Sequence, residues 1–270
     1  MTPEMLSGAL RVYAIVGDPV AQVKSPAGVT QALRTRGHDA IVVPFRVPPA
    51  GLRAFFAGLQ SARNVDGAIV TVPHKFAACD LCARMSARAR FLGAVNAMRR
   101  TPDGAWEGDM FDGLGYVSGM RQLGCDPRGK RVLLVGAGGA GTAMAHALVE
   151  AGVAMLAIHD ESLSRRDALV ARLAALDSAR VEAGGPDPAG MDVVLNATPA
   201  GMRARDPLPV ATARLTAAMF VGDVVTAPVV TPLLVAARAR GCTTMTGADM
   251  FAQVRDLMVD FFVAGARDAG

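Results

Sequence analysis

One stretch of this chain has the residue types and spacing of a ligand-binding turn. "VLLVGAGGAGTAMAHAL" contains Gly136, Gly138 and Gly141 in a G-x-G-x-x-G pattern that follows an apolar strand and opens an Ala-rich helix. Glycines let the backbone turn tightly and bring bare amides up to a pyrophosphate at a helix N-terminus. A tight structural turn is the simpler alternative, but the strand–turn–helix setting favours a dinucleotide site.

An acidic residue follows at the distance such a site requires. Asp160, in "AIHDES", lies 19 residues beyond Gly141, close to the ~20 expected for a carboxylate that binds a ribose hydroxyl pair. A carboxylate there repels a 2′-phosphate, and Glu161 adds a second negative charge. The sequence therefore predicts NAD as the preferred cofactor, while Arg165 and Arg166, one helical turn further on, keep NADP possible.

A second stretch, "IVTVPHKF" at 69–76, is a β-branched run that reaches a proline and then offers a histidine and a lysine. Pro73 cannot donate to a sheet ladder, so the strand is expected to end there. Lys75 then lies at the carboxyl end of a strand, where α/β proteins place their chemistry. A solvated lysine opening the next helix is the simpler reading of this stretch alone.

Short apolar runs alternate with helical patterns between positions 1 and 112 of the chain. This alternation favours a largely parallel sheet covered by helices, and "TPDG" at 101–104 indicates a turn. Strands are predicted at 12–16, 40–47, 67–72 and 94–99, and helices at about 26–36, 50–60 and 74–85.

A second alternating series begins after the polar, turn-rich segment 124–131. Thr231 and Pro232 form an N-cap and first-turn proline, and Gly241 follows the same helix as a C-cap. The last segment, 249–266, has apolar residues at helical spacing and is expected to pack back on the chain. Strands of this series are predicted at 132–136, 154–159, 192–197, 219–225 and 243–246.

The composition narrows the class of protein. A chain of 270 residues with a formal net charge of +4 suits one large or two ordinary domains. No basic block, no membrane-length apolar run and no export signal are present, so we expect a cytoplasmic protein without nucleic-acid or membrane partners. Cys79 and Cys82 form a C-x-x-C without a second ligand pair, so they are interpreted as thiols on a helix face, and no metal site is predicted.

Six motifs, in order along nearly the whole chain, resemble those of the shikimate/quinate dehydrogenase family. The combination of "TVPHK" with "GAVN" and a later "DG" is the most specific. The motifs are "GDPVAQVKSPAGV" (17–29), "GAIVTVPHK" (67–75), "LGAVNAM" (92–98), "GDMFDG" (108–113), "NATPAGM" (196–202) and "GADMF" (247–251).

The resemblance implies an α/β fold of two lobes. An N-terminal α/β substrate-binding domain, residues 1–112, precedes a Rossmann-type doubly wound parallel-sheet dinucleotide-binding domain, residues 113–247. A C-terminal helix, 248–270, packs back on the first domain. The implied activity is an NAD(P)-dependent oxidoreductase that interconverts shikimate, quinate or a close analogue and its 3-dehydro ketone by hydride transfer.

The resemblance also implies roles for individual residues. Lys75 would exchange a proton with the reacting hydroxyl, and Asp112 would orient the lysine and the substrate, although Asp112 also suits a helix N-cap. A turn-forming role competes with substrate binding for Asn96. The implied substrate-binding residues are Ser25, Thr71, Asn96 and Gln253, and the cofactor-binding residues are Gly136, Gly138, Gly139, Ala140, Gly141, Asp160, Thr198, Val224 and Gly247.

The chain departs from the family pattern around the substrate. Val23 replaces the first of two serines, and Lys24 or Gln22 could compensate for it; Ile69 replaces the asparagine of the N-V-T motif. Thr226 replaces a tyrosine, and Met110 and Phe111 replace the Asn–Thr of N-T-D-G, which predicts a more apolar wall. Gln253 comes one residue early after Met250, which turns it by ~100° on a helix.

These departures leave the ring substituents open. The predicted partner is a small cyclic polyhydroxy carboxylate, bound by a monomer or homodimer. The alternative hypothesis is a non-catalytic or weakly active dinucleotide-binding sensor of the same fold, which the altered carboxylate contacts favour and the retention of Lys75 with Asp112 disfavours.

Overall fold

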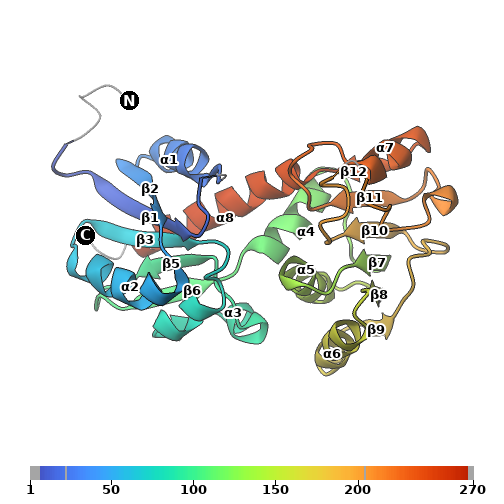
Figure 1. Ribbon diagram of the computed structural model, residues 1–270, viewed down its shortest axis with the longest axis horizontal. Helices are drawn as coiled ribbons and strands as arrows, with labels where there is room; N and C mark the ends of the chain where they lie inside the picture. The colour runs from blue at the N-terminus through green and yellow to red at the C-terminus, as the bar shows by residue number, and fades with distance from the viewer. Residues whose placement is uncertain (1–6, 22, 204, 267–270) are drawn as a thin grey trace. The chain divides into compact units, whose positions relative to one another are not determined.

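The computed structural model describes residues 7–21, 23–203 and 205–266, and the chain forms two compact units (Figure 1). Unit 1 comprises residues 1–111 and 255–270, and unit 2 comprises residues 112–254. The sequence placed the corresponding boundaries at 112/113 and 247/248. Each unit has its own six-stranded sheet, so the α/β class with a Rossmann-type domain is confirmed.

The sheet of unit 1 is mixed. Its strand order is β2-β1-β3-β5-β6-β4, with β1 parallel to β2 and β3, and β5 antiparallel to β3 and β6. The elements are β1 (Arg11–Gly17), α1 (Ser25–Thr35), β2 (Ala40–Arg46), η2 (Pro49–Gly51), α2 (Leu52–Ser61), β3 (Val65–Val70), η3 (Ala77–Leu81), β4 (Arg84–Met85), α3 (Ala87–Leu92), β5 (Ala97–Arg100) and β6 (Trp106–Asp109).

The expectation of a largely parallel sheet is wrong for the second half of this sheet. The predicted turn at 101–104 joins β5 to β6 as a hairpin, with the amide of Thr101 donating to the carbonyl of Ala105 at 3.0 Å. A hairpin makes its two strands antiparallel, and β6 was not expected from the sequence.

The expected helix at 74–85 is also wrong. The Lys75 carbonyl accepts the amide of Val95 at 2.9 Å, whereas in an α-helix it would accept the amide of Cys79. The Cys79 amide instead donates to the carbonyl of Phe76 at 3.1 Å, which produces the short 3₁₀ helix η3. Burial raises the pKa of Cys82 to about 12, so this thiol stays protonated.

Helix α8 (Gly247–Ala266) contributes its second half to unit 1. Phe262 is 2 % exposed and packs on Tyr13 of the interior strand β1, with ring centroids 4.7 Å apart. The guanidinium of Arg99 lies over the ring of Phe261 and donates to its carbonyl at 2.9 Å. The predicted closing helix therefore completes the core of unit 1.

The sheet of unit 2 is fully parallel, in the order β12-β11-β10-β7-β8-β9. Read from β9, this is the doubly wound order 3-2-1-4-5-6, whose direction of winding reverses beside β7. The elements are α4 (Asp112–Gln122), β7 (Arg131–Val135), α5 (Gly139–Glu150), β8 (Met155–His159), α6 (Leu163–Ala174), β9 (Arg180–Ala183), β10 (Val193–Asn196), η4 (Thr212–Arg214), β11 (Phe220–Asp223), α7 (Pro232–Ala239) and β12 (Thr243–Met245).

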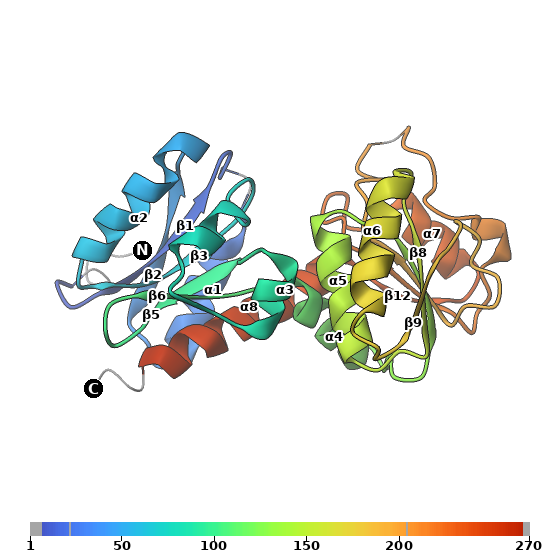
Figure 2. The same cartoon turned by 90° about the horizontal axis from the view of Figure 1, so that it is seen from below.

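Helices cover both faces of this sheet. Leu133 and Val135 belong to one buried cluster with Leu233 and Leu234 of α7. Because side chains alternate along a strand, the buried Leu134 faces the opposite layer, where α5 and α6 lie together (Figure 2). Thr231 caps α7 by accepting the amide of Leu234, and Gly241 adopts a left-handed φ of 80°, as predicted. No helix within the described ranges is both long and apolar enough to cross a membrane.

Candidate active site

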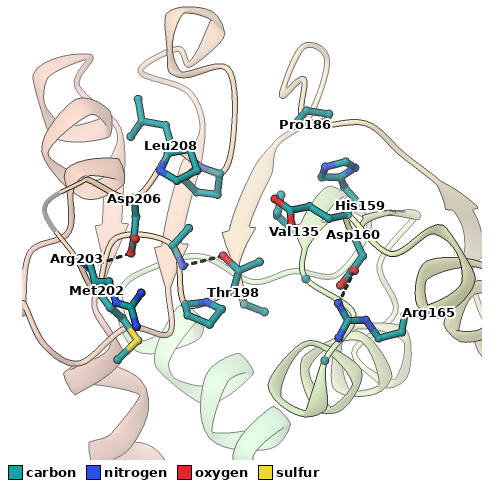
Figure 3. Close-up of a pocket in the computed structure, with 18 residues that line it drawn as sticks. Val135, His159, Asp160, Arg165, Pro186, Thr198, Met202, Arg203, Asp206 and Leu208 are labelled. Atoms are coloured by element: carbon teal, nitrogen blue, oxygen red, sulfur yellow. Dashed lines mark hydrogen bonds and ion pairs between the residues drawn. The ribbon is translucent and has the colours of Figure 1, made fainter.

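The carboxyl ends of β7, β8 and β10 in unit 2 surround a pocket of about 800 Å³ (Figure 3). β7 lies between the other two strands, at the point where the winding of the sheet reverses. Ligands of open α/β sheets bind at this reversal, so the topology alone selects this edge of the sheet.

The glycine turn forms one side of the pocket. Gly136 has a left-handed φ of 108°, and a side chain at Gly138 or Gly139 would meet nothing within 4 Å. Gly136 and Gly138 line the pocket, while Gly139, Ala140 and Gly141 form the first turn of α5. This open approach to a helix N-terminus fits the pyrophosphate of a dinucleotide.

Asp160 is fixed beside the same turn at the end of β8. Asp160 is 7 % exposed, and its carboxylate accepts the amides of Ala137 at 2.7 Å and Ser162 at 2.8 Å. Arg165 donates to it from the pocket rim at 3.1 Å. Burial opposes ionisation, but the two amides and Arg165 outweigh it, so the pKa of Asp160 is lowered and the group is charged near neutrality.

The loop that follows β10 forms the facing wall (Figure 3). Thr198 lines the pocket, and its hydroxyl donates to the side-chain oxygen of Asn196 at 2.7 Å. Asp206 accepts the amides of Gly201 at 3.1 Å and Arg203 at 2.9 Å, which closes the loop on itself.

A buried carboxylate holds this loop to the next strand. Asp223, at the end of β11, accepts hydrogen bonds from the side chains of Asn196 at 3.1 Å and Thr231 at 2.7 Å and from the amide of Val225 at 3.0 Å. Burial raises the pKa of Asp223 against these bonds. The network fixes the ends of β10 and β11, and so the position of Thr198.

Val224 and Gly247 lie together beyond the pocket lining. A side chain at Gly247 would come within 2.5 Å of the carbonyl of Val224, so only glycine allows α8 to begin here. Both residues were predicted to bind the cofactor, and their contacts to it stay a prediction.

The substrate residues predicted for unit 1 come from two irregular segments and the start of a helix. Lys75 lies in the irregular segment between β3 and η3, and Thr71 opens that segment. Asn96, 1 % exposed, accepts the amide of Phe111 at 3.0 Å, so it fixes the chain just before Asp112. Ser25 is the buried first residue of α1.

Two neighbours of these residues in the chain, Met110 and Phe111, are buried. Met110 and Phe111 were expected to form an apolar substrate wall, but each is only 4 % exposed. Phe111 packs on Phe261 and beneath the guanidinium of Arg88. These two side chains therefore belong to the buried core of unit 1, and a substrate wall formed by them stays a prediction.

Other predicted residues have partners or settings of their own. The amide of Gln253 accepts from Ser118 at 3.0 Å and donates to Gln122 at 2.9 Å, both on α4, so its role in substrate binding stays a prediction. Asp112 is the first residue of α4, where the helix dipole stabilises a carboxylate. Lys24 is exposed, and Gln22 lies outside the described residues.

Most of the wall formed by the loop after β10 was not predicted from the sequence, and neither was His159. The proline and glycine density of 199–209 marks an irregular loop, but nothing local shows that it folds over the glycine turn. The pocket residues that were not predicted are Val135, His159, Pro186, Ala197, Pro199, Ala200, Met202, Arg203, Asp206, Pro207, Leu208 and Pro209.

Comparisons with known proteins agree on one family. Residues 15–98 match the family model of the shikimate dehydrogenase substrate binding domain. A shikimate dehydrogenase (NADP(+)) of Acidiphilium cryptum is 39 % identical over 246 residues, which cover 91 % of this chain and 88 % of the relative.

Solved structures of related dehydrogenases and reductases are also similar to this chain. Quinate dehydrogenase from Corynebacterium glutamicum in complex with NAD has a TM-score of 0.84 at 29 % identity and covers 94 % of each chain. Ligand-free 5-ketofructose reductase of Gluconobacter sp. strain CHM43 has a TM-score of 0.87 at 28 % identity, covering 94 % of this chain and 93 % of the reductase.

The doubly wound sheet, its glycine turn and these relatives define an oxidoreductase of the Rossmann-type NAD(P)-binding class. Within that class, the chain belongs to the shikimate dehydrogenase family.

Proposed function

We propose that this protein interconverts shikimate, quinate or a close ring analogue and the 3-dehydro ketone, with NAD as its preferred cofactor. Unit 1, which includes residues 255–266 of α8, would hold the substrate, and unit 2 would hold the dinucleotide. The family-model match within unit 1 and the glycine-turn pocket of unit 2 support this division. The observation that carries the proposal is the pairing of that pocket with a "TVPHK" loop in one chain of this family.

The chemistry assigned to the chain's own residues is proton transfer and orientation. A bound nicotinamide supplies the hydride acceptor for alcohol oxidation and the hydride donor for ketone reduction. The amine of Lys75 takes the proton of the reacting hydroxyl as the carbonyl forms, and it returns that proton in the reverse direction. Asp112, held at the first turn of α4, orients the hydroxyl and the amine. Ser25, Thr71 and Asn96 supply the remaining polar contacts to the ring.

The negative charge around Asp160 supports the preference for NAD. Its carboxylate already accepts three hydrogen bonds, which leaves about one of its four acceptor positions for a ribose hydroxyl. A 2′-phosphate brought to the same place would meet this carboxylate and Glu161, which also lines the pocket. Arg165 offsets one of these two charges. The relatives named for NADP(+) point to the other cofactor, so the preference for NAD needs its own test.

The cofactor test is the ratio of kcat/KM for NAD to kcat/KM for NADP. We expect a ratio above ten for the wild-type enzyme. Asp160→Asn together with Glu161→Gln should lower the ratio at least tenfold, since two like charges near the phosphate are removed. Asp167→Asn, outside the pocket lining and paired with Arg166, serves as the matched control and should leave the ratio unchanged. A wild-type preference for NADP would refute this part.

The activity test is a panel of ring acids measured at the nicotinamide absorbance band. Turnover of shikimate or quinate should fall by 10²- to 10⁴-fold in Lys75→Ala. Lys130→Ala, an exposed lysine of unit 2, is the control. A folded, NAD-binding protein that turns over none of the panel would favour the sensor hypothesis instead.

A second candidate is reduction of an uncharged polyhydroxy ketone. The half-buried Val23 and the exposed Thr226 offer fewer hydrogen-bond donors to a substrate carboxylate than the family pattern does. The structural neighbour named 5-ketofructose reductase acts on such a ketone. Including 5-ketofructose in the same panel separates the two candidates, because a higher kcat/KM for it than for every ring acid would select the second.

A further inference from the structure

The segment that carries Lys75 has no regular secondary structure of its own. β3 ends at Val70 and η3 begins at Ala77, so residues 71–76 form an irregular connection. Catalytic groups on such connections keep their geometry only where surrounding contacts fix the backbone.

Backbone hydrogen bonds fix both ends of this connection. The Val72 carbonyl accepts the amide of Asp18 at 3.1 Å, and the Lys75 carbonyl accepts the amide of Val95 at 2.9 Å. The apolar side chains of Val72 and Phe76 do not anchor it, because each is 63 % exposed.

His74 is the side chain that enters the core between these two exposed residues. It is 1 % exposed, and its Nε2 lies 2.7 Å from the carbonyl oxygen of Val47. A carbonyl can only accept, so the proton is on Nε2 and the imidazole donates. Val47 is itself held, since its amide donates to the carbonyl of Gly17 at 3.1 Å.

The imidazole therefore ties the residue next to Lys75 to the chain that leaves β2. We propose that His74 is a positioning residue that acts through Lys75: its Nε2–H···O bond to Val47 fixes the backbone from which the lysine side chain extends. The inference rests on the proton-transfer role of Lys75 proposed above. The tether itself, which is the hydrogen bond from His74 to the carbonyl of Val47, is independent of that role.

Two substitutions separate the hydrogen bond from the packing. In His74→Gln, the side-chain amide nitrogen reaches about as far as the imidazole Nε2 and can donate to Val47. His74→Leu fills similar space without a donor. We expect kcat of the leucine variant to fall at least tenfold with KM for NAD within twofold, and kcat of the glutamine variant to stay within threefold of wild type.

The Lys75→Ala background tests whether His74 acts through the lysine. If it does, His74→Leu lowers the residual rate of that variant by less than twofold, because the group it positions is already gone. A further tenfold loss in that background, equal losses for glutamine and leucine, or full activity of the leucine variant would each overturn the proposal.

Hydrogen exchange of the amides of residues 74–76 gives a readout that needs no substrate. Exchange should be faster in His74→Leu and near wild type in His74→Gln. If no ring acid is turned over, the proposed function fails, but this difference still supports the tether, whereas equal exchange in both variants refutes it. Should the leucine variant not fold, His74→Asn, whose amide stops short of Val47, takes its place.

Discussion

A single methyl group at Gly141 should damage both the fold and the cofactor pocket. A Cβ at this position would lie 1.8 Å from the carbonyl oxygen of Gly136, and real Cβ atoms do not approach closer than about 3.0 Å. The two groups must therefore separate until the distance between them reaches 3.0 Å. Gly136 lines the pocket, so the displacement reaches the bound dinucleotide.

The magnitude follows from the overpacking. Forcing an extra methyl group into a closely packed site costs about 1–3 kcal/mol. For a domain of this size, that cost lowers Tm by about 2–12 °C. We also expect the Kd for NAD to rise at least tenfold, equivalent to about 1.4 kcal/mol of lost binding free energy. Thermal unfolding and calorimetric titration with NAD measure the two effects.

Gly138→Ala is the matched control from the same turn. Its methyl group would meet nothing within 4 Å, and its φ of −76° suits alanine. We expect an unchanged Tm with weakened NAD binding, because the methyl group would stand in the open approach to the helix N-terminus. Wild-type Tm and Kd in Gly141→Ala, or an equal loss of Tm in Gly138→Ala, would refute the steric reasoning.

Three further outcomes are expected. Thr231→Ala should lower the free energy of unfolding by about 1–2 kcal/mol in urea titrations, because it removes the cap of α7 and a bond to Asp223, and Thr231→Ser should restore most of it. Arg88→Met should cost about 1.5–3 kcal/mol, since it removes the charged partner of the buried Asp109 and leaves it only the hydrogen bonds from Ser86 and Met110. Arg84→Met, from the exposed pair with Asp103, should cost less than about 1 kcal/mol, and equal losses would contradict this. The folded pKa of Asp160 lies below its unfolded value of about 3.9, so this residue stabilises the protein above that value and the contribution is lost as pH falls through the folded pKa. Tm measured from pH 2.5 to 6 should therefore fall less steeply on acidification in Asp160→Asn than in wild type.

Local patterns were enough where the decisive interactions are local. The glycine turn, the cap at Thr231 and the left-handed Gly241 depend on backbone geometry within a few residues, and the structure has them as expected. The alternation of apolar runs and helical patterns likewise predicted two α/β units.

The errors arose where distant contacts decide the outcome. The segment 74–85 does not form the expected helix: the Lys75 carbonyl accepts the amide of Val95, which lies outside that segment, and the Cys79 amide donates to Phe76. β9 was missed because its residues are only partly buried or exposed at the sheet edge, which leaves no apolar signature. The packing of Phe111 on Phe261 was not foreseen, because Phe261 belongs to the last helix of the chain, far away in the sequence.

The candidate active site shows the same contrast between features set by local sequence and features set by distant contacts. Asp160 could be found from spacing alone, but its bond to Ala137 and the closure of the facing loop by Asp206 depend on the sheet that brings β7, β8 and β10 together. His159 and the proline-rich wall have no spacing rule that would have identified them.

The place of α8 in the fold sets an order for biosynthesis. Phe262, which packs on Tyr13 of unit 1, belongs to a segment that the ribosome makes only after the whole of unit 2, positions 112–254. At about 5–20 residues per second, the nascent first unit waits roughly 7–30 s before Tyr13 of β1 can gain this partner. The dinucleotide-binding unit is therefore the first for which the complete chain becomes available, and the last stage of maturation belongs to the unit translated earliest.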